Sequence, residues 1–174
     1  MQGSRDFWVL ANGNNLPVSN AQHYIAGLSY ETNGFVFDVE GYYKKLKGLT
    51  EYSLRFTTDL GGITYDDSFF QGNGSTKGID FMVQKKAGRY NGWIGYTLSE
   101  TLHNYPVYQS ADFHASNDVT NEFKVLNMYK LGKWDFSLTW IYATGRPYTE
   151  PTGGYSVTLL DGSQQDFVSI TSKN

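Results

Sequence analysis

The sequence contains no cysteine and only 4 prolines among its 174 residues. Without cysteine, the chain has neither a disulfide scaffold nor thiolate ligands for a metal ion. No stretch approaches the roughly 18 to 20 apolar residues that a membrane-spanning helix needs. Any segment that crosses a membrane must therefore be a strand, because in lipid only helices and closed barrels satisfy all of their backbone polar groups.

An excess of charge of one sign is also lacking. The formal net charge is −3, which gives no electrostatic reason to expect a nucleic acid as a partner. The first six residues, Met1 to Asp6, contain neither the basic segment nor the apolar segment of a secretion signal. We therefore expect one domain, residues 1–174, that carries no signal peptide and is a fragment of a longer protein.

Aromatic residues and glycine are abundant, with 14 tyrosines, 4 tryptophans and 19 glycines, a mixture that favours strands and turns over helices. Polar and apolar side chains alternate with period two in six segments, as they do in a strand with two different faces. The clearest segment places Phe35, Phe37 and Val39 opposite Asp38 and Glu40. The six predicted strands cover approximately residues 22–32, 35–45, 77–86, 90–101, 121–131 and 134–142.

The predicted connections alternate between short and long. Short turns at 33–34, 87–89 and 132–133 alternate with long links at about 47–75 and 102–120, and a third long segment starts at Thr144. Outer-membrane barrels have tight periplasmic turns and long extracellular loops. Ten residues at about 3.3 Å each, tilted by about 45°, reach roughly 23 Å, which is close to the apolar band of such barrels. The pattern predicts an all-β, antiparallel up-and-down meander that is a fragment of a large transmembrane β-barrel.

The positions of the aromatic residues favour the same fold. One group flanks the short turns (Tyr30, Phe35, Tyr90 and Trp134), and a second group lies near the opposite strand ends (Tyr24, Tyr43, Trp140 and Tyr142). Such barrels carry an aromatic girdle at each membrane interface. The alternative is a soluble sheet in which these residues are simply good strand formers. Alternation alone leaves both open, because a soluble sandwich turns its apolar faces inward with the same period.

No constellation of residues points to catalysis. The three histidines, His23, His103 and His114, lack the spacing of a zinc site. The acid groupings, Asp112 near His114 and the pair Asp66 and Asp67, fall in predicted loops. Residues 72–78 lack the spacing of a phosphate-binding loop and precede a strand, so they predict a turn and strand entry. We expect no enzyme activity, no cofactor and no metal site.

A candidate ligand surface lies in the predicted loop 47–75. Aromatic platforms with a few polar groups suit sugars, peptides or siderophores, and binding residues often lie on loops held by a rigid scaffold. The alternative is a loop that packs on its own aromatic side chains. The candidate ligand-binding residues are Tyr52, Arg55, Tyr65, Asp66, Asp67 and Phe69.

Several short sequence segments, which together cover the chain to about residue 150, resemble a known protein family. They lie at 15–27, 37–45, 72–80, 92–99, 129–134 and 144–149. In order and spacing they resemble the C-terminal part of the barrel in TonB-dependent outer-membrane receptors of the Bacteroidetes type. That family often has an Asp-x-x-His after the second long loop, whereas this sequence has Asp118 and Asn121.

The resemblance implies a 22-stranded barrel in the outer membrane of a Gram-negative cell, which imports a siderophore, glycan or peptide in a TonB-dependent manner. Its partners would be outer-membrane lipid, the remaining barrel strands and plug domain, TonB through regions outside this chain, and an unidentified extracellular ligand. The face carrying Val36, Asp38, Glu40, Tyr42 and Lys44 would line the lumen. The alternatives are a complete small outer-membrane barrel and a soluble β-sandwich carbohydrate-binding module. Residues 150–174 are compatible with a hairpin inside an extracellular loop.

Overall fold

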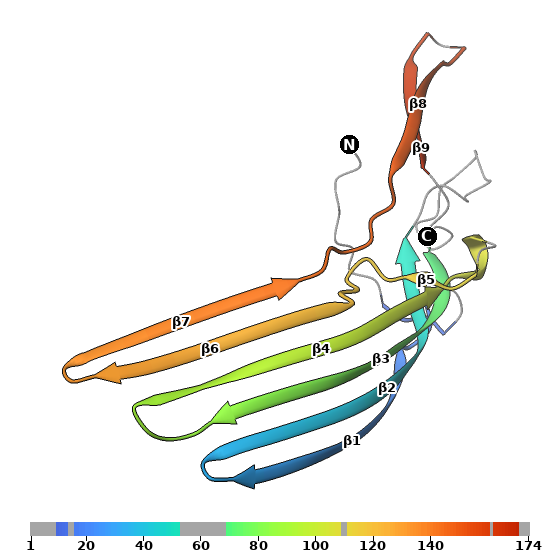
Figure 1. The fold of residues 1–174 in the computed structure, drawn as a ribbon. Coiled ribbons are helices and arrows are strands. Elements are labelled where there is room, and N and C mark those ends of the chain that lie inside the picture. Colours follow the sequence, from blue (N-terminus) through green and yellow to red (C-terminus); the bar gives the residue numbers. More distant parts are fainter. Residues whose placement is uncertain (1–9, 14–15, 53–68, 109–110, 161, 171–174) are drawn as a thin grey trace.

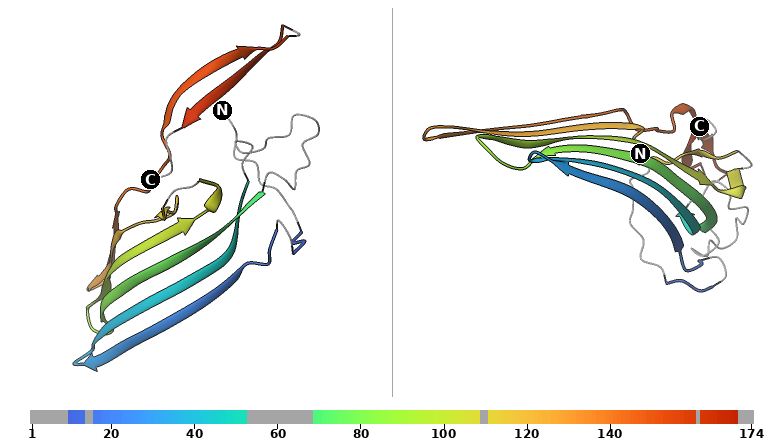
Figure 2. Two further views of the ribbon diagram at one scale, coloured as in Figure 1. Left: turned by 90° about the vertical axis from the view of Figure 1, so that its right-hand side faces the viewer. Right: turned by 60° about the horizontal axis from the view of Figure 1, so that its bottom comes forward.

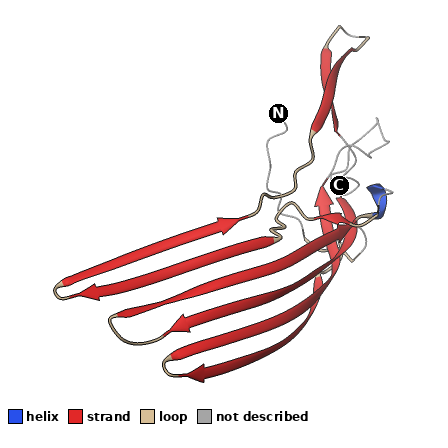
Figure 3. Cartoon of the chain, viewed as in Figure 1, coloured by secondary structure: helices blue, strands red, loops and turns tan. Residues whose placement is uncertain are grey.

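The computed structural model describes residues 10–13, 16–52, 69–108, 111–160 and 162–170. Strands dominate it, together with one short 3-10 helix, η2 (Pro106–Tyr108) (Figure 3). The strands are β1 (Asn20–Thr32), β2 (Phe35–Tyr52), β3 (Phe69–Lys85), β4 (Tyr90–Asn104), β5 (Phe113–His114), β6 (Asn121–Leu131), β7 (Trp134–Ala143), β8 (Pro151–Thr158) and β9 (Gln164–Ile170).

Seven of these strands form one antiparallel sheet in the order β1-β2-β3-β4-β6-β7, and β5 pairs with β4 beside this path (Figure 1). Each long strand is hydrogen-bonded to its neighbour in the chain, which confirms the predicted all-β antiparallel meander. The sheet is not closed, since β1 and β7 each pair on one side only among the described residues. Figure 2 shows it as a single curved layer.

The short turns gather at one end of the sheet and the long connections at the other (Figure 1). In the β1–β2 turn, Asn33 and Gly34 have φ angles of 49° and 76°, the left-handed conformation that a type I′ hairpin requires at both positions. Gly132 turns β6 into β7 with φ 62°. The turns predicted at 33–34 and 132–133 are therefore confirmed.

The strands β2 and β3 are longer than predicted, with 18 and 17 residues. The prediction of a loop over 47–75 is wrong at both ends, because pairing continues to Tyr52 and Phe69 and leaves 53–68 as the connection. A register shift between Lys47 and Leu49 explains the first error, because Gly48, with φ 69°, absorbs it as a bulge.

The prediction of a turn and strand entry over 72–78 is wrong too, since these residues lie inside β3. Glycines weaken a strand, but here aromatic rings from β2 and from the residue that follows β4 cover two of them. A Cβ added to Gly72 would lie 2.6 Å from the Tyr105 ring, and one added to Gly78 would collide with the Tyr42 hydroxyl.

A second sheet consists of β8 and β9 alone, paired antiparallel from Pro151–Ile170 to Thr158–Gln164. The hairpin expected in the 150–174 region is confirmed. Its place in an extracellular loop stays a prediction.

Candidate functional site

The register of the large sheet assembles two continuous faces. Side chains paired across all six long strands share a face, and the central rows of one face are almost entirely apolar. The first row is Leu28, Val39, Phe81, Tyr96, Phe123 and Tyr142. The second row is Tyr30, Phe37, Val83, Ile94, Val125 and Trp140. We call this surface the apolar face.

The opposite face, which we call the polar face, carries charged and hydroxyl side chains at the same height. Its central row is Gly27, Glu40, Asp80, Thr97, Glu122 and Ala143. Thr97 donates a hydrogen bond to Asp80, and Lys124 forms an ion pair of 2.6 Å with Glu122. Val36, Asp38, Glu40, Tyr42 and Lys44 share this face, as the alternation predicts.

The apolar face is the more exposed of the two. On β2, Phe37 and Val39 are 41% and 39% exposed, whereas Val36 on the polar face is 6% exposed. Buried hydrophobic side chains in the described part of the chain are few, namely Leu16, Val36, Tyr105, Phe113 and Ala115. A soluble protein rarely leaves a contiguous apolar surface of this extent in water. The sheet therefore offers a large apolar surface that needs a cover.

Charged side chains bound the apolar face at both ends. Near the short turns, the Lys85 ammonium lies 4.4 Å from the centre of the Phe35 ring. Near the long connections, Lys77 pairs with Glu100 at 2.6 Å. The eight residue steps from Lys77 to Lys85 span roughly 26 Å along the strand and, at a tilt of about 40°, roughly 20 Å of depth. Between these two lysines, β3 presents only Ile79, Phe81 and Val83 to the apolar face.

The connection between β4 and β6 folds back onto the sheet around a buried carboxylate. The side chain of Asp118 is 1% exposed. It accepts a hydrogen bond of 2.8 Å from the Thr101 amide and lies 2.8 Å from Nδ1 of His114. The Ala115 amide donates back to the Thr101 carbonyl at 2.9 Å. These bonds hold residues 113–118 against β4.

Beside the Asp118 carboxylate lies a cluster of four aromatic rings, which we call the aromatic cap. Its members are His103, Tyr105, Tyr108 and Phe113. Their ring centres lie 6.0 to 6.4 Å apart, and the Tyr105 and Phe113 rings stack. Burial, together with the nearby Glu51 carboxylate, raises the pKa of Tyr105 to about 12. The Tyr108 hydroxyl donates a 2.7 Å hydrogen bond to Glu51. The cap thus ties the end of β2 to the β4–β6 connection.

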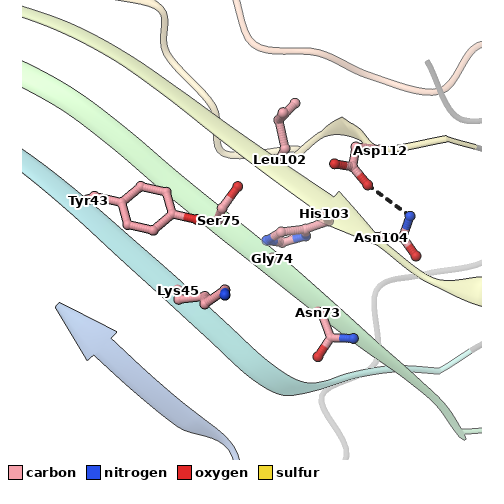
Figure 4. Close-up of a pocket in the computed structure, with 9 residues that line it drawn as sticks. All are labelled: Tyr43, Lys45, Asn73, Gly74, Ser75, Leu102, His103, Asn104 and Asp112. Carbon is pink, nitrogen blue, oxygen red and sulfur yellow. Dashed lines mark hydrogen bonds between the residues drawn. The ribbon is translucent and has the colours of Figure 1, made fainter.

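Two open recesses lie near this end of the sheet. One, of about 260 Å³, borders the aromatic cap and is lined by Thr50, Glu51, His103, Tyr105, Phe113, His114, Ser116, Pro147, Tyr148 and Thr149. The other, of about 210 Å³, is lined by Tyr43, Lys45, Asn73, Gly74, Ser75, Leu102, His103, Asn104 and Asp112 (Figure 4). The first combines aromatic rings with carboxylate, hydroxyl and imidazole groups.

Of the candidate ligand-binding residues, Tyr52 and Phe69 are described. They are the last residue of β2 and the first of β3, and their ring centres lie 5.3 Å apart. Arg55, Tyr65, Asp66 and Asp67 lie outside the described residues, so ligand binding at this set stays a prediction.

The aromatic cap was missed in the sequence. Its signal was the density of aromatic residues in the predicted link 102–120, which resembles that of 47–75. The suggested grouping of Asp112 with His114 is wrong, because Asp118 pairs with His114 and Asp112 accepts a 2.8 Å hydrogen bond from Asn104. A spacing of four residues in a chain without helical periodicity does not reveal such a pair.

Comparisons with protein-family models, curated proteins and solved structures find no match to the chain. Among the described residues, no helix has the length and apolar character that crossing a membrane requires. Within the same residues, no group of three or more histidine, cysteine, aspartate or glutamate side chains is placed to hold a metal ion.

Proposed function

We propose that the chain is a section of an outer-membrane β-barrel, and that the whole barrel is a receptor that imports a ligand in a TonB-dependent manner. The observation that carries the proposal is that the exposure of the two faces is the reverse of that in a soluble protein. Its continuous apolar face is exposed while its charged face is the more enclosed one. Barrels in lipid have this arrangement, with apolar side chains outward and polar ones toward the lumen.

The dimensions of the apolar face support lipid as its cover. Its depth of roughly 20 Å between two lysines approaches the apolar band of about 25 Å in such barrels, and lysine side chains extend toward the interface. Aromatic rings lie at both margins, including Phe35 and Tyr90 near the short turns and Tyr24 and Tyr43 near the long connections. Such rings are enriched at membrane interfaces.

The open edges of the sheet support a larger barrel. An unpaired backbone amide or carbonyl costs several kcal/mol in lipid. Both β1 and β7 pair on one side only among the described residues, so further strands are needed to satisfy their outer edges. In that barrel, the row with Glu40, Asp80 and Glu122 would line the lumen.

The receptor role rests on the resemblance of the strings between residues 15 and 149 to the TonB-dependent family, and on the long connections at one end of the sheet. These connections carry the recess beside the aromatic cap, whose rings and polar groups suit a glycan, peptide or siderophore. The plug domain and the contact with TonB would belong to other parts of the full-length receptor.

Association with lipid tests the membrane assignment. The purified chain is mixed with phosphatidylcholine vesicles and centrifuged through a density gradient, while its size in detergent-free buffer is measured in parallel. We expect the chain to float with the vesicles, to be β-rich by circular dichroism and to aggregate in buffer. A compact monomer in plain buffer that does not float would contradict the proposal and favour the soluble carbohydrate-binding sandwich.

Transport is tested separately in cells that produce the full-length receptor. We expect uptake of its ligand to stop when TonB is deleted, while binding at the cell surface remains. Uptake that continues without TonB would contradict the receptor role and leave the membrane assignment standing.

A further inference from the structure

We propose that the apolar face carries, at its end near the long connections, a binding site for the phosphate-bearing headgroup of an anionic lipid. The site is centred on Lys45 and Lys47 of β2. The inference rests on the proposed function, because it needs the apolar face to lie in a membrane, and it adds a lipid partner and a place for it.

The two lysines lie on the apolar face beyond its aromatic margin. Because side chains alternate along β2, Lys45 and Lys47 point to the same side as Tyr43. Lys45 pairs with Gln22 and Ser75, and Lys47 pairs with Asn20 and Asn73. Amide and hydroxyl side chains of β1 and β3 thus flank the two ammonium groups. Figure 4 shows Lys45 and Ser75 beside Tyr43 in the recess of about 210 Å³.

Among the described residues, the charge balance around these two ammonium groups is positive. The nearest acid on the same face of β4, Glu100, already pairs with Lys77 at 2.6 Å. The recess is lined by one acid, Asp112, which accepts a hydrogen bond from Asn104 and offsets one of the two positive charges (Figure 4). In the described part of the chain, neither Lys45 nor Lys47 belongs to an ion pair. The patch therefore has a net positive charge and several neutral groups that can donate hydrogen bonds.

Continuity with the apolar face favours a lipid over a free anion. From the lysines toward the short turns, the next pair on this face is Tyr24 with Tyr43, and Leu28 with Val39 follows two pairs farther along. A headgroup held by the lysines would place its acyl chains on these side chains. The long connections mark the extracellular end of an outer-membrane barrel, so the lipid would belong to the outer leaflet.

The experiment compares two kinds of vesicle, phosphatidylcholine alone and phosphatidylcholine with added phosphatidic acid. The ratio of the two affinities is measured for the unchanged chain, for the K45Q/K47Q variant and for a K130Q/K133Q control. The control removes the same charge from exposed positions at the short-turn end. Because a lysine bound to the headgroup phosphate makes charge-assisted hydrogen bonds that an exposed lysine elsewhere does not, we expect K45Q/K47Q to lower the ratio about thirty-fold and the control to change it little.

Four results would overturn the site. An equal loss in both variants would indicate diffuse charge attraction. Saturable binding of inorganic phosphate to the detergent-solubilised chain, abolished by K45Q/K47Q, would reassign the patch to free phosphate. A chain that binds neither vesicle would refute the site together with the proposed function. By contrast, a chain that binds both vesicles equally would refute the site alone.

Discussion

A lysine placed at the centre of the apolar face should prevent stable association with lipid. Phe81 lies midway between Lys77 and Lys85 on β3 and pairs with Val39 and Tyr96. At about 3.3 Å per residue and a tilt of about 40°, Phe81 lies roughly 10 Å in depth from each of the two lysines. A lysine at the bilayer midplane costs about 2 to 4 kcal/mol. Phe81→Lys should therefore weaken partitioning into vesicles by about thirty-fold to about a thousand-fold.

The neighbouring residue provides a matched control. Met82 faces the other side of β3 and pairs with Asp38, so Met82→Lys adds the same charge beside a carboxylate. A cross-strand pair of opposite charge contributes about 0.2 to 1 kcal/mol, and this variant should partition nearly as well as the unchanged chain. The fraction that floats with phosphatidylcholine vesicles is measured for both variants across a urea series. Equal losses, or a larger loss for Met82→Lys, would refute the assignment of the two faces.

Three further predictions concern the packing of the sheet and its cap. Gly78→Ala would push its Cβ into the Tyr42 hydroxyl and should destabilise the sheet by about 1 to 3 kcal/mol in urea unfolding. The loss should shrink when Tyr42 is also alanine, and an unchanged loss would contradict this packing. Asp118→Ala removes the buried acceptor of the Thr101 amide, so hydrogen exchange of that amide should accelerate, whereas Asp118→Asn, which keeps an acceptor oxygen, should have a smaller effect. Because the pKa of Tyr105 is about 12 in the folded chain against an ordinary 10.0, its contribution to stability is complete below pH 10 and is lost as the pH rises from 10 to 12. The difference in ultraviolet absorbance between the unchanged chain and Tyr105→Phe should titrate near pH 12, and a midpoint near 10 would contradict the burial of this ring.

The six long strands could be predicted because period-two alternation and turn chemistry are local signals. β6 has the same bounds as predicted, even though Leu126 and Met128 interrupt its alternation, since the register is fixed by the Gly132 turn and by pairing with β4. The extensions of β2 and β3 could not be predicted. They depend on Gly48 absorbing a bulge and on the Tyr105 ring covering Gly72, and both effects need the neighbouring strand.

The surfaces at the long-connection end were only partly visible in the sequence. Tyr52 and Phe69 stood out by residue type, and their ring contact follows from the pairing of β2 with β3. The contacts of Asp118 depend on the fold of residues 113–120, whose sequence has no periodicity from which it could be predicted. Lys45 and Lys47 continue the alternation of β2. That neither belongs to an ion pair within the described ranges, where Lys77 pairs with Glu100, becomes visible only in the structure.

The central claim is that one face of the sheet lies against lipid hydrocarbon, and two tryptophans test it directly. Trp140 is 53% exposed on the apolar face, whereas Trp93 pairs with Gln84 and Leu126 on the polar face. Variants that each keep one of the four tryptophans are incorporated into vesicles of lipid brominated on its acyl chains. Strong quenching of the Trp140 fluorescence, with little quenching of Trp93, is the predicted result. Equal quenching of both, or quenching of Trp140 only by iodide in the water, would contradict the claim.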